Sequence, residues 1–362
     1  MNNMVTDTIL VTGGAGFIGS NFVLNCIARG QRVVNLDLLT YAGNLTTLAG
    51  IDGNSLHVFV RGDIADRALV ERLLSEHRPV GIVNFAAETH VDRSIDGPAA
   101  FVQTNVVGTL VLLEAATDYW RSLRREDASR FRFLQVSTDE VYGSMGPDGA
   151  ASEASPFAPN SPYAASKAAS DHLVRAFWRT YGLPTLTTHC SNNYGPRQFP
   201  EKLIPLVIQR AISGQPIPVY GDGLHVRDWL HVDDHCRAVA TVLAIGAPGE
   251  TYNVGADAGL QNLAMVKLIC GALDRLRPRT DGVNYSSQVA FVPDRPGHDR
   301  RYAVDSGKIR TSLGWAPEIE LQRGIDLTVE WYLANQAWVQ GVSDGSYRLE
   351  RLGTGQKGRE AI

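Results

Sequence analysis

The chain has 362 residues, of which 44% are hydrophobic and 20% charged, so it can bury a large core and is not disordered. Its net charge of −4 offers no general attraction to nucleic acid or to an anionic membrane. The four cysteines, Cys26, Cys190, Cys236 and Cys270, include no C-x-x-C pair, which predicts reduced thiols and a cytoplasmic protein. The polar start has no signal-peptide pattern, and no run approaches eighteen uninterrupted apolar residues, so we expect no membrane partner.

Short apolar runs alternate with helical patterns through the first half of the chain. We predict strands at residues 8–12, 32–36, 56–60, 81–85, 131–136 and 185–189. We predict helices at residues 16–28, 66–77, 98–120 and 161–181. This alternation indicates an α/β fold with a Rossmann-type, doubly wound parallel sheet over residues 1–190.

The second half of the chain has a different pattern, with short runs, prolines and Gly221-Asp222-Gly223. We expect residues 191–340 to form mainly a smaller mixed α/β lobe that binds the substrate and has no independent core. The segment 231–246 should return to the large sheet. We expect the polar residues 341–362 to form a flexible tail.

A glycine-rich loop, Gly13-Gly14-Ala15-Gly16-Phe17-Ile18-Gly19, joins the first strand to the first helix. In this context the glycines let the backbone approach a pyrophosphate at the helix N-terminus, although tight packing alone would also explain them. Asp37 ends the second strand, where a carboxylate binds a ribose 2′-hydroxyl and repels a 2′-phosphate, so NAD is favoured over NADP. Asp63-Ile64 and Phe85-Ala86-Ala87 end later strands and are candidate NAD contacts, but each alone is equally consistent with a turn or a packed strand end.

Tyr163 and Lys167 are four residues apart in a predicted helix and therefore share one face. We expect the ammonium to lower the pKa of the phenol, which can then remove a hydroxyl proton during oxidation. Lys167 can also hold the nicotinamide ribose. Y-x-x-x-K is a weak motif alone, and the preceding dinucleotide loop makes it informative.

Thr138, Asp139 and Glu140 follow the strand predicted at 131–136, at the edge where open α/β sheets bind ligands. A turn cap beside a solvated glutamate is the simpler explanation of an isolated Asp-Glu pair. Two carboxylates held together should titrate as a coupled pair, with one kept protonated near neutrality. We therefore predict one acid and one base.

These motifs together resemble the extended short-chain dehydrogenase/reductase family and, within it, the dTDP-glucose 4,6-dehydratases. The similar stretches are residues 11–21, 39–44, 85–92, 138–143, 163–171, 191–196, 199–205 and 294–299, and the resemblance runs from about Ile9 to about Trp331. The loop 256–261 and the end of the chain, 347–362, depart from the family pattern.

The resemblance implies that a hexose is oxidised at C4, loses water across C5 and C6, and is reduced at C6. Tyr163 with Thr138 and Lys167 would carry the oxidation, Glu140 would remove the C5 proton, and Asp139 would protonate the departing hydroxyl. The product from dTDP-glucose would be dTDP-4-keto-6-deoxyglucose. The ketone must form first because it acidifies the C5 proton.

The loop, the strand ends and the resemblance together give two predicted contact sets. The NAD contacts are Gly13, Gly16, Phe17, Ile18, Gly19, Asp37, Leu38, Leu39, Thr40, Asp63, Ile64, Phe85, Ala86, Ala87, Thr104, Tyr163, Lys167 and Asn193. The substrate contacts are Thr89, Thr138, Asn192, Lys202, Leu203, Pro218, Tyr220, Arg227, Asn262, Arg295 and His298. Among these, Lys202, Arg227 and Arg295 suit a diphosphate. The resemblance also implies a homodimer formed by helices 98–120 and 161–181.

Three alternatives remain open from the sequence. A nucleotide-sugar 4-epimerase would use the same Tyr163–Lys167 pair but has small residues where Asp139 and Glu140 stand. A dehydratase acting on UDP- or CDP-glucose would share most of the chemistry, and a non-catalytic NAD sensor would not need the intact Thr138, Tyr163 and Lys167. His231 and His235 have metal-ligand spacing, but no further ligand accompanies them, so we predict no metal.

Overall fold

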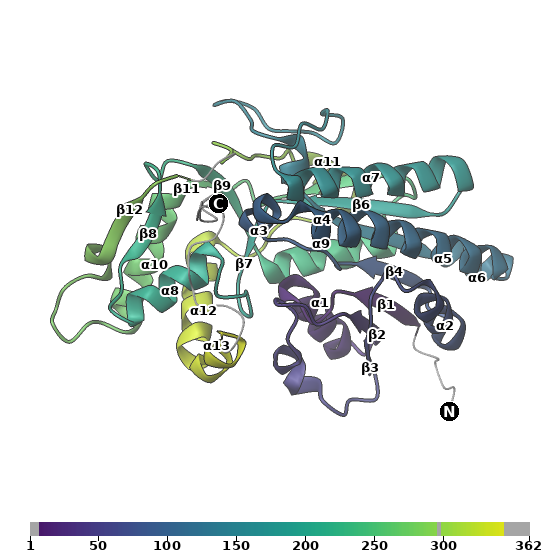
Figure 1. Cartoon of the computed structure of the whole chain (residues 1–362), viewed down its shortest axis with the longest axis horizontal. Helices are drawn as coiled ribbons and strands as arrows, with labels where there is room; N and C mark the ends of the chain where they lie inside the picture. The colour runs from purple at the N-terminus through teal and green to yellow at the C-terminus, as the bar shows by residue number, and fades with distance from the viewer. Residues whose placement is uncertain (1–6, 295–297, 344–362) are drawn as a thin grey trace, which may run out of the picture.

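The computed structural model describes residues 7–294 and 298–343. At its centre lies a seven-stranded sheet in the order β10-β6-β5-β4-β1-β2-β3, with every neighbouring pair parallel (Figure 1). The strands are β1 (Thr8–Thr12), β2 (Arg32–Asp37), β3 (His57–Arg61), β4 (Gly81–Asn84), β5 (Arg132–Thr138), β6 (Thr185–Cys190) and β10 (Thr251–Val254). The six strands predicted from the sequence are all present within two residues of their predicted bounds, which confirms the Rossmann-type fold.

Helices cover both faces of this sheet because its strands are apolar on both sides. In β1, Ile9 and Val11 belong to one buried cluster and Leu10 belongs to another, as the alternation of side chains along a strand requires. The first face is covered by α1 (Phe17–Ala28) and α9 (Val232–Ile245), and the second by α2 (Arg67–His77), α5 (Thr109–Ser122) and α7 (Pro162–Tyr181).

The helix predicted at 98–120 is one continuous helical stretch with an irregular centre. It begins as α4 (Pro98–Phe101), widens into a π-helical segment, η2 (Val102–Gly108), and continues as α5. The segment predicted at 231–246 does return to the sheet, since α9 packs on β5 and β6, and the following β10 pairs with β6.

Most of the remaining second half forms the smaller lobe, at the left of Figure 1, whereas α11 (Gly307–Leu313) packs on α9 and β10 of the large sheet. The lobe contains two small sheets, β11-β9-β7 and β12-β8. Their strands are β7 (Asn192–Tyr194), β8 (Ile217–Tyr220), β9 (Val226–His231), β11 (Gly259–Gln261) and β12 (Val289–Val292), and the larger helices are α8 (Leu203–Ile212), α10 (Asn262–Leu276), α12 (Leu321–Ala334) and α13 (Gln336–Ser343). The shorter elements of the chain are η1 (Leu45–Ile51), α3 (Val91–Asp96), α6 (Arg125–Arg130), η3 (Asp139–Tyr142), η4 (Tyr285–Gln288) and α11 (Gly307–Leu313).

Two expectations about this half need correction. The lobe has its own cluster of fully buried side chains, including Met265, Ile269 and Ile325, so the expectation that it lacks a core was wrong. Its helices α8, α10 and α12 pack together around that cluster. Residues 341–343, predicted as the start of a flexible tail, instead form the end of helix α13; the rest of that prediction, residues 344–362, lies outside the described residues.

Two further features bear on earlier expectations. All four cysteines are free thiols, and three of them are buried. The continuous helix Pro98–Ser122 is long and apolar enough to cross a membrane by length and composition, although 44% of its most apolar window is buried inside the protein.

His235 should make the fold sensitive to acid. Its side chain is fully buried in α9, neither ring nitrogen has a hydrogen-bond partner among residues 7–294 and 298–343, and burial lowers the pKa of His235 from 6.5 to about 3. The unfolded chain binds a proton at His235 more tightly than the folded chain does. The free energy of unfolding is therefore highest above pH 6.5 and decreases as the pH falls from 6.5 toward 3. Between pH 7 and pH 5 this residue alone should cost about 2 kcal/mol of unfolding free energy.

Urea unfolding at these two pH values checks this prediction. The variant His235→Leu should lose less stability than the parent between pH 7 and pH 5, because it has no imidazole to protonate. A change at the exposed His172, as in His172→Gln, should leave the parental pH dependence intact. An equal loss of stability in the parent and in His235→Leu would contradict the account.

Candidate active site

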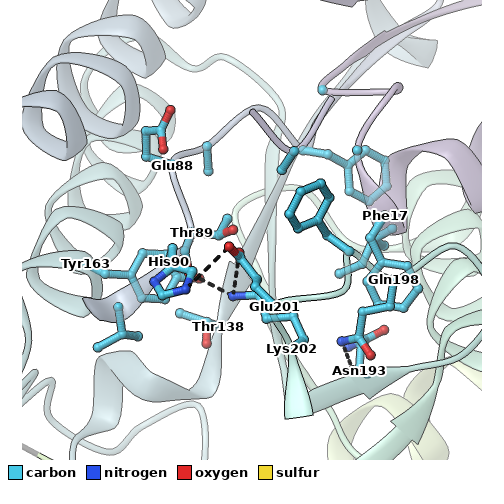
Figure 2. A pocket seen from close by; sticks show the side chains of 18 of the residues that line it. Phe17, Glu88, Thr89, His90, Thr138, Tyr163, Asn193, Gln198, Glu201 and Lys202 are labelled. Carbon is cyan, nitrogen blue, oxygen red and sulfur yellow. Dashed lines mark hydrogen bonds and ion pairs between the residues drawn. The ribbon is translucent and has the colours of Figure 1, made fainter. Parts of the chain in front are cut away.

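A cavity of about 580 Å³ lies where the carboxyl ends of the sheet strands face the smaller lobe. Its lining includes all five predicted catalytic residues and every predicted NAD contact except Leu39. It also includes every predicted substrate contact except Arg295, which lies outside the described residues. Residues far apart in the sequence therefore meet in one cavity at the sheet edge where open α/β folds bind ligands (Figure 2).

The glycine loop serves both packing and ligand access. A Cβ atom on Gly13, whose φ is +70°, would lie 2.6 Å from the backbone nitrogen of Ala86, and a Cβ on Gly19 would lie 2.2 Å from the carbonyl oxygen of Gly13. Tight packing thus excludes side chains at these two positions. Gly16 differs, since a Cβ there would meet only one atom, at 3.4 Å. Gly16 caps α1 without a side-chain hydrogen bond, which leaves the first N–H groups of the helix for an anion.

The end of β2 fits the ribose of NAD. Asp37 is buried, and its two carboxylate oxygens accept hydrogen bonds of 2.8 Å from the backbone N–H groups of Ala15 and Leu39. These bonds fix the carboxylate beside the glycine loop, and burial raises the pKa of Asp37. Leu39 has a φ of +57° and helps to orient this carboxylate, although its side chain does not line the cavity.

The remaining NAD positions lie on other elements of the same wall. Thr104 comes from η2, Asp63 and Ile64 follow β3, and Asn193 comes from β7. The amide nitrogen of Asn193 donates to the carbonyl of Ser191, while its oxygen Oδ1 is buried with no hydrogen-bond partner in the part of the chain that the structure describes. An unpartnered buried acceptor on this wall fits the carboxamide or hydroxyl donors of a dinucleotide.

Thr138, Tyr163 and Lys167 meet because β5 ends beside α7. Figure 2 shows Thr138 close to Tyr163. Lys167 is buried, and its Nζ donates a 2.8 Å hydrogen bond to the carbonyl of Val136 in β5. The ring of Phe101 packs edge-on against Tyr163. The structure thus brings together the three side chains that were predicted to carry the oxidation.

The expectation that Lys167 lowers the pKa of Tyr163 was wrong for this structure. Burial and the negative charge of Glu140 raise the pKa of Tyr163 well above 10, and the hydrogen bond with Thr138 opposes this only in part. Burial also lowers the pKa of Lys167, and the negative charge of Asp171 opposes this shift. The helical spacing placed the two residues on one face correctly, but it could not show that both would be removed from water.

Asp139 and Glu140 form the first turn after β5, within η3. Asp139 is almost fully buried, its Oδ2 has no hydrogen-bond partner, and its Oδ1 accepts a 3.3 Å bond from the Thr138 hydroxyl. Burial raises the pKa of Asp139, and the charges of Glu140 and Asp228 add to the effect. This shift favours the protonated form of Asp139.

The smaller lobe contributes the rest of the cavity wall. Arg227 is buried, donates to the carbonyls of Val226 and Asp299, and stacks over the ring of Tyr302 at 4.3 Å. Asn262 is the first residue of α10. Lys202 is partly exposed, with its Nζ 3.4 Å from the carbonyl oxygen of Thr89. These residues place cationic and amide groups opposite the catalytic residues.

The atypical loop 256–261 is well anchored despite its departure from the family pattern. The carboxylate of Asp228 accepts hydrogen bonds from the N–H groups of Ala256, at 3.0 Å, and Ala258, at 2.7 Å. Asp257 takes the left-handed conformation between them, with a φ of +55°. The loop then enters β11, which pairs with β9 and leads directly into Asn262.

Sequence reasoning missed a charged cluster at the centre of the cavity, around Glu201. Glu201 accepts a hydrogen bond from the Tyr41 hydroxyl at 3.2 Å, and its carboxylate lies 3.4 Å from Nε2 of His90 and 3.9 Å from Nζ of Lys202 (Figure 2). Its side chain is only 1% exposed, and burial raises the pKa of Glu201. The position of Glu201 next to Lys202, which was predicted to bind the diphosphate, was a signal in the sequence for a role in the cavity. Its neighbours His90 and Tyr41, however, come from distant segments of the chain.

Comparisons with known proteins agree with this geometry. A family model described as GDP-mannose 4,6 dehydratase matches residues 10–328. The chain is 66% identical to a dTDP-glucose 4,6-dehydratase from Xanthomonas campestris, over 96% of this chain and 99% of that protein. It is 52% identical to one from Escherichia coli, over 95% of this chain and 99% of that protein.

Solved structures of nucleotide-sugar enzymes are also similar to this chain. A dTDP-glucose 4,6-dehydratase from Streptomyces venezuelae, solved with NAD and TYD bound, is 47% identical, covers 92% of this chain and 99% of its own, and superposes with a TM-score of 0.84. A UDP-glucose 4-epimerase from Thermotoga maritima is 32% identical, with a TM-score of 0.81 and coverage of 91% and 99%. On these similarities, the chain belongs to the dTDP-glucose 4,6-dehydratases, the NAD-dependent hydro-lyases of the nucleotide-sugar branch of the short-chain dehydrogenase/reductases.

Proposed function

We propose that the protein converts dTDP-glucose to dTDP-4-keto-6-deoxyglucose and water. The observation that carries this proposal is the pair Asp139 and Glu140 in the same cavity as Thr138, Tyr163 and Lys167. A dehydrogenase or a 4-epimerase needs only the last three residues. The loss of water also requires an acid and a base, which two further carboxyl groups supply. The increased pKa of Asp139 favours its protonated form, which suits it to be the acid.

Tyr163, ionised to its phenolate, would begin the reaction by removing the proton of the C4 hydroxyl, and the positive charge of Lys167 would favour this ionisation. When bound, NAD would supply the hydride acceptor for C4 and the hydride donor for C6, and C5 would be reprotonated as the hydride returns. The hydrogen bond between Thr138 and Tyr163 orients the phenol toward the hydroxyl and opposes the increase in its pKa. Lys167, held by its bond to Val136, positions the ribose near the phenol and adds a positive charge to the site.

Glu140 and Asp139 would then expel water. Once C4 is a ketone, the C5 proton is acidic enough for Glu140 to remove it, and Asp139 donates its proton to the departing C6 hydroxyl. The Thr138 hydroxyl donates a hydrogen bond to Asp139. This bond connects a residue proposed for the oxidation with a residue proposed for the loss of water. Because Asp139 must begin protonated and Glu140 ionised, the increased pKa of Asp139 favours this assignment over the reverse.

The substrate would lie across the cavity with its sugar over Tyr163 and its nucleotide toward the smaller lobe. Lys202, Arg227 and Arg295 are proposed to bind the diphosphate, and Asn192, Tyr220, Asn262 and His298 to bind the rest of the nucleotide sugar. Thr89, Leu203 and Pro218 complete this wall. The residues 1–190 are proposed as the NAD-binding domain and the lobe within 191–340 as the substrate domain.

A comparison of substrates with the isolated protein tests this function. With dTDP-, UDP- and CDP-glucose at equal concentrations, we expect a 4-keto-6-deoxy product from dTDP-glucose at a rate at least tenfold above the other two. Equal turnover of UDP- or CDP-glucose would overturn the base assignment alone. Recovery of galactose-configured product with every hydroxyl intact would replace the dehydratase with an epimerase.

We also propose a cytoplasmic homodimer built on the helices 98–122 and 162–181. Val102 and Val107 on the first helix are exposed large apolar side chains, and Ala165 and Ala176 are exposed on the neighbouring α7. A second copy would bury this face, and α5, η2 and α7 already pack side by side. Such a patch on a helix pair is typical of an interface between subunits.

Charge placed in this patch should therefore dissociate the protein. Val102→Arg, at a side chain that is 51% exposed, should convert a dimer into a monomer, because an interface would bury the new charge without a partner. Analytical ultracentrifugation measures the mass directly. Phe291→Arg, at an apolar residue on β12 that is 59% exposed, is the matched control and should remain dimeric. A parent protein that sediments as a monomer would refute the dimer.

A further inference from the structure

The catalytic face of α7 carries a third ionisable side chain, Asp171, which the proposed mechanism does not use. Asp171 follows Lys167 by four residues, as Lys167 follows Tyr163, so the three share one face of the helix. Asp171 is only 5% exposed and does not line the cavity. A carboxylate removed from water in this way destabilises a fold unless donors or positive charges compensate it. The neighbours of Asp171 therefore indicate its role.

The donors to Asp171 come from the two strands that end beside the catalytic residues. The Ser137 hydroxyl of β5 donates a 2.6 Å hydrogen bond to Oδ2 of Asp171. Nε2 of His189 in β6 lies 3.2 Å from the same oxygen and acts as a donor, because a carboxylate only accepts. Ser137 and His189 are direct partners in the ladder between β5 and β6, and Thr138 is the next residue of β5. Asp171 thus ties α7 to both strands at the point where Thr138 meets Tyr163.

The same network extends to η3, the turn that carries the two proposed catalytic carboxyl groups. The Tyr142 hydroxyl lies 2.7 Å from Nδ1 of His189 and donates a 2.8 Å hydrogen bond to Oδ1 of Asn253. Nδ2 of Asn253 donates in turn to the carbonyl of Ala151. Tyr142 and His189 are both buried. Because η3 begins at Asp139 and ends at Tyr142, these contacts fix the end of the turn.

Asp171 also places a negative charge near Lys167. The second oxygen of Asp171, Oδ1, is buried and has no hydrogen-bond partner within residues 7–294 and 298–343. Nζ of Lys167 donates to the carbonyl of Val136, which is an uncharged acceptor. Burial lowers the pKa of Lys167, and Asp171 provides the largest opposing effect. The charge of Asp171 therefore favours the ammonium form of Lys167.

The other ionisable groups around this face of α7 stay unchanged when Asp171 is substituted. They are Tyr163 on α7, Cys190 and His189 on β6, and Asp139 and Glu140 on η3. Of these, Cys190 also acts on Lys167. Burial raises the pKa of Cys190 to about 12, so its thiol is neutral at lower pH. A change in the titration of Lys167 can therefore be assigned to Asp171.

We propose that Asp171 is a positioning residue for the oxidation at C4, a role that rests on the proposed function. It holds β5 and β6 against α7, which aligns Thr138 with Tyr163, and it supplies the counter-charge of Lys167. The Lys167 ammonium stabilises the phenolate of Tyr163, so loss of the Asp171 charge should slow the oxidation even where the site keeps its shape. Because Asp171 lies outside the cavity wall, the binding of NAD and substrate should not depend on it.

Asp171→Asn tests the charge with little change of shape. In the protein with NAD bound, NMR of isotope-labelled lysine should place the titration midpoint of Lys167 about one pH unit lower in Asp171→Asn than in the parent. Lys167→Met identifies the signal. This measurement uses no substrate and does not depend on turnover. Asp118→Asn, which removes an exposed carboxylate on α5, is the matched control and should keep the parental midpoint.

Stopped-flow formation of reduced nicotinamide then measures the oxidation itself. Asp171→Asn should lose about tenfold more of its rate at pH 9 than at pH 7, because Lys167 gives up its proton at a lower pH in this variant. The kcat should fall while the KM for dTDP-glucose stays near the parental value. Ser137→Ala removes one hydrogen bond and keeps the charge, so its Lys167 midpoint should remain parental. Asp171→Glu restores the charge and should recover the parental pH dependence.

Either of two results would overturn the proposal. One is an unchanged midpoint of Lys167 in Asp171→Asn. The other is a rate that falls equally at pH 7 and pH 9, which would leave Asp171 with a structural role alone. Asp171→Ser provides a second neutral variant if the asparagine protein does not fold. A lowered midpoint in a protein whose parent does not oxidise dTDP-glucose would refute the proposed function and leave the effect of Asp171 on Lys167 intact.

Discussion

Tyr163→Phe should abolish turnover by preventing the first oxidation. The substitution removes only the hydroxyl, and the phenylalanine ring can still pack against Phe101 and fill the same space. Without a general base at the C4 hydroxyl, the rate should fall by about 10³-fold or more. Stopped-flow spectroscopy at high enzyme concentration should detect no reduced nicotinamide, even transiently, when dTDP-glucose is added.

The matched controls for this variant separate chemistry from binding. NAD and dTDP should bind with near-parental affinity, because the phenol is assigned to proton transfer. The thermal midpoint should change little, since the substitution removes the hydrogen bond with Thr138 and keeps the surrounding packing. Rapid formation of reduced nicotinamide in Tyr163→Phe would show that another residue is the base.

Asp139→Asn and Glu140→Gln should allow oxidation and stop the loss of water. Neither amide can transfer the required proton, so we expect turnover to fall by about 10²–10³-fold in each variant. The oxidised sugar should accumulate together with reduced nicotinamide, in contrast to Tyr163→Phe. A rapid chemical quench followed by borohydride reduction and mass spectrometry would identify the 4-keto hexose.

Hydrogen exchange at C5 distinguishes the two carboxylates. In D₂O, Asp139→Asn keeps the proposed base and should incorporate deuterium at C5 of the trapped ketone. Glu140→Gln lacks the base and should not. Asp118→Asn, on the exposed surface of α5, is the control and should turn over at the parental rate. Parental turnover by both active-site variants, or exchange only in Glu140→Gln, would show that the roles are wrongly assigned.

Much of this fold was predictable from local patterns. Buried parallel strands such as β1 are short apolar runs between glycines and helices, so their positions followed from periodicity. The part of the cavity lining that lies at the strand ends was predictable for the same reason, because the strands of a parallel sheet end at one edge. The lining contributed by the smaller lobe was expected only from the family resemblance. The position of Thr138 after β5 and the four-residue spacing of Tyr163 and Lys167 needed no knowledge of long-range contacts.

The parts that could not be predicted depend on burial and distant neighbours. The sequence contains Glu201, but only the fold brings Tyr41 and His90 to its carboxylate. The pKa of Tyr163 rises because the phenol is removed from water, which helical spacing does not encode. The contact between His225 and Asp294 similarly joins segments on either side of α10.

Dehydration through an internal hydrogen transfer is most directly tested with dTDP-glucose deuterated at C4. The purified enzyme should release dTDP-4-keto-6-deoxyglucose that carries the deuterium at C6, because the hydrogen taken from C4 is the one returned to C6. The solvent should contribute hydrogen at C5. Product with deuterium retained at C4, or a C6 hydrogen drawn from water, would contradict the account.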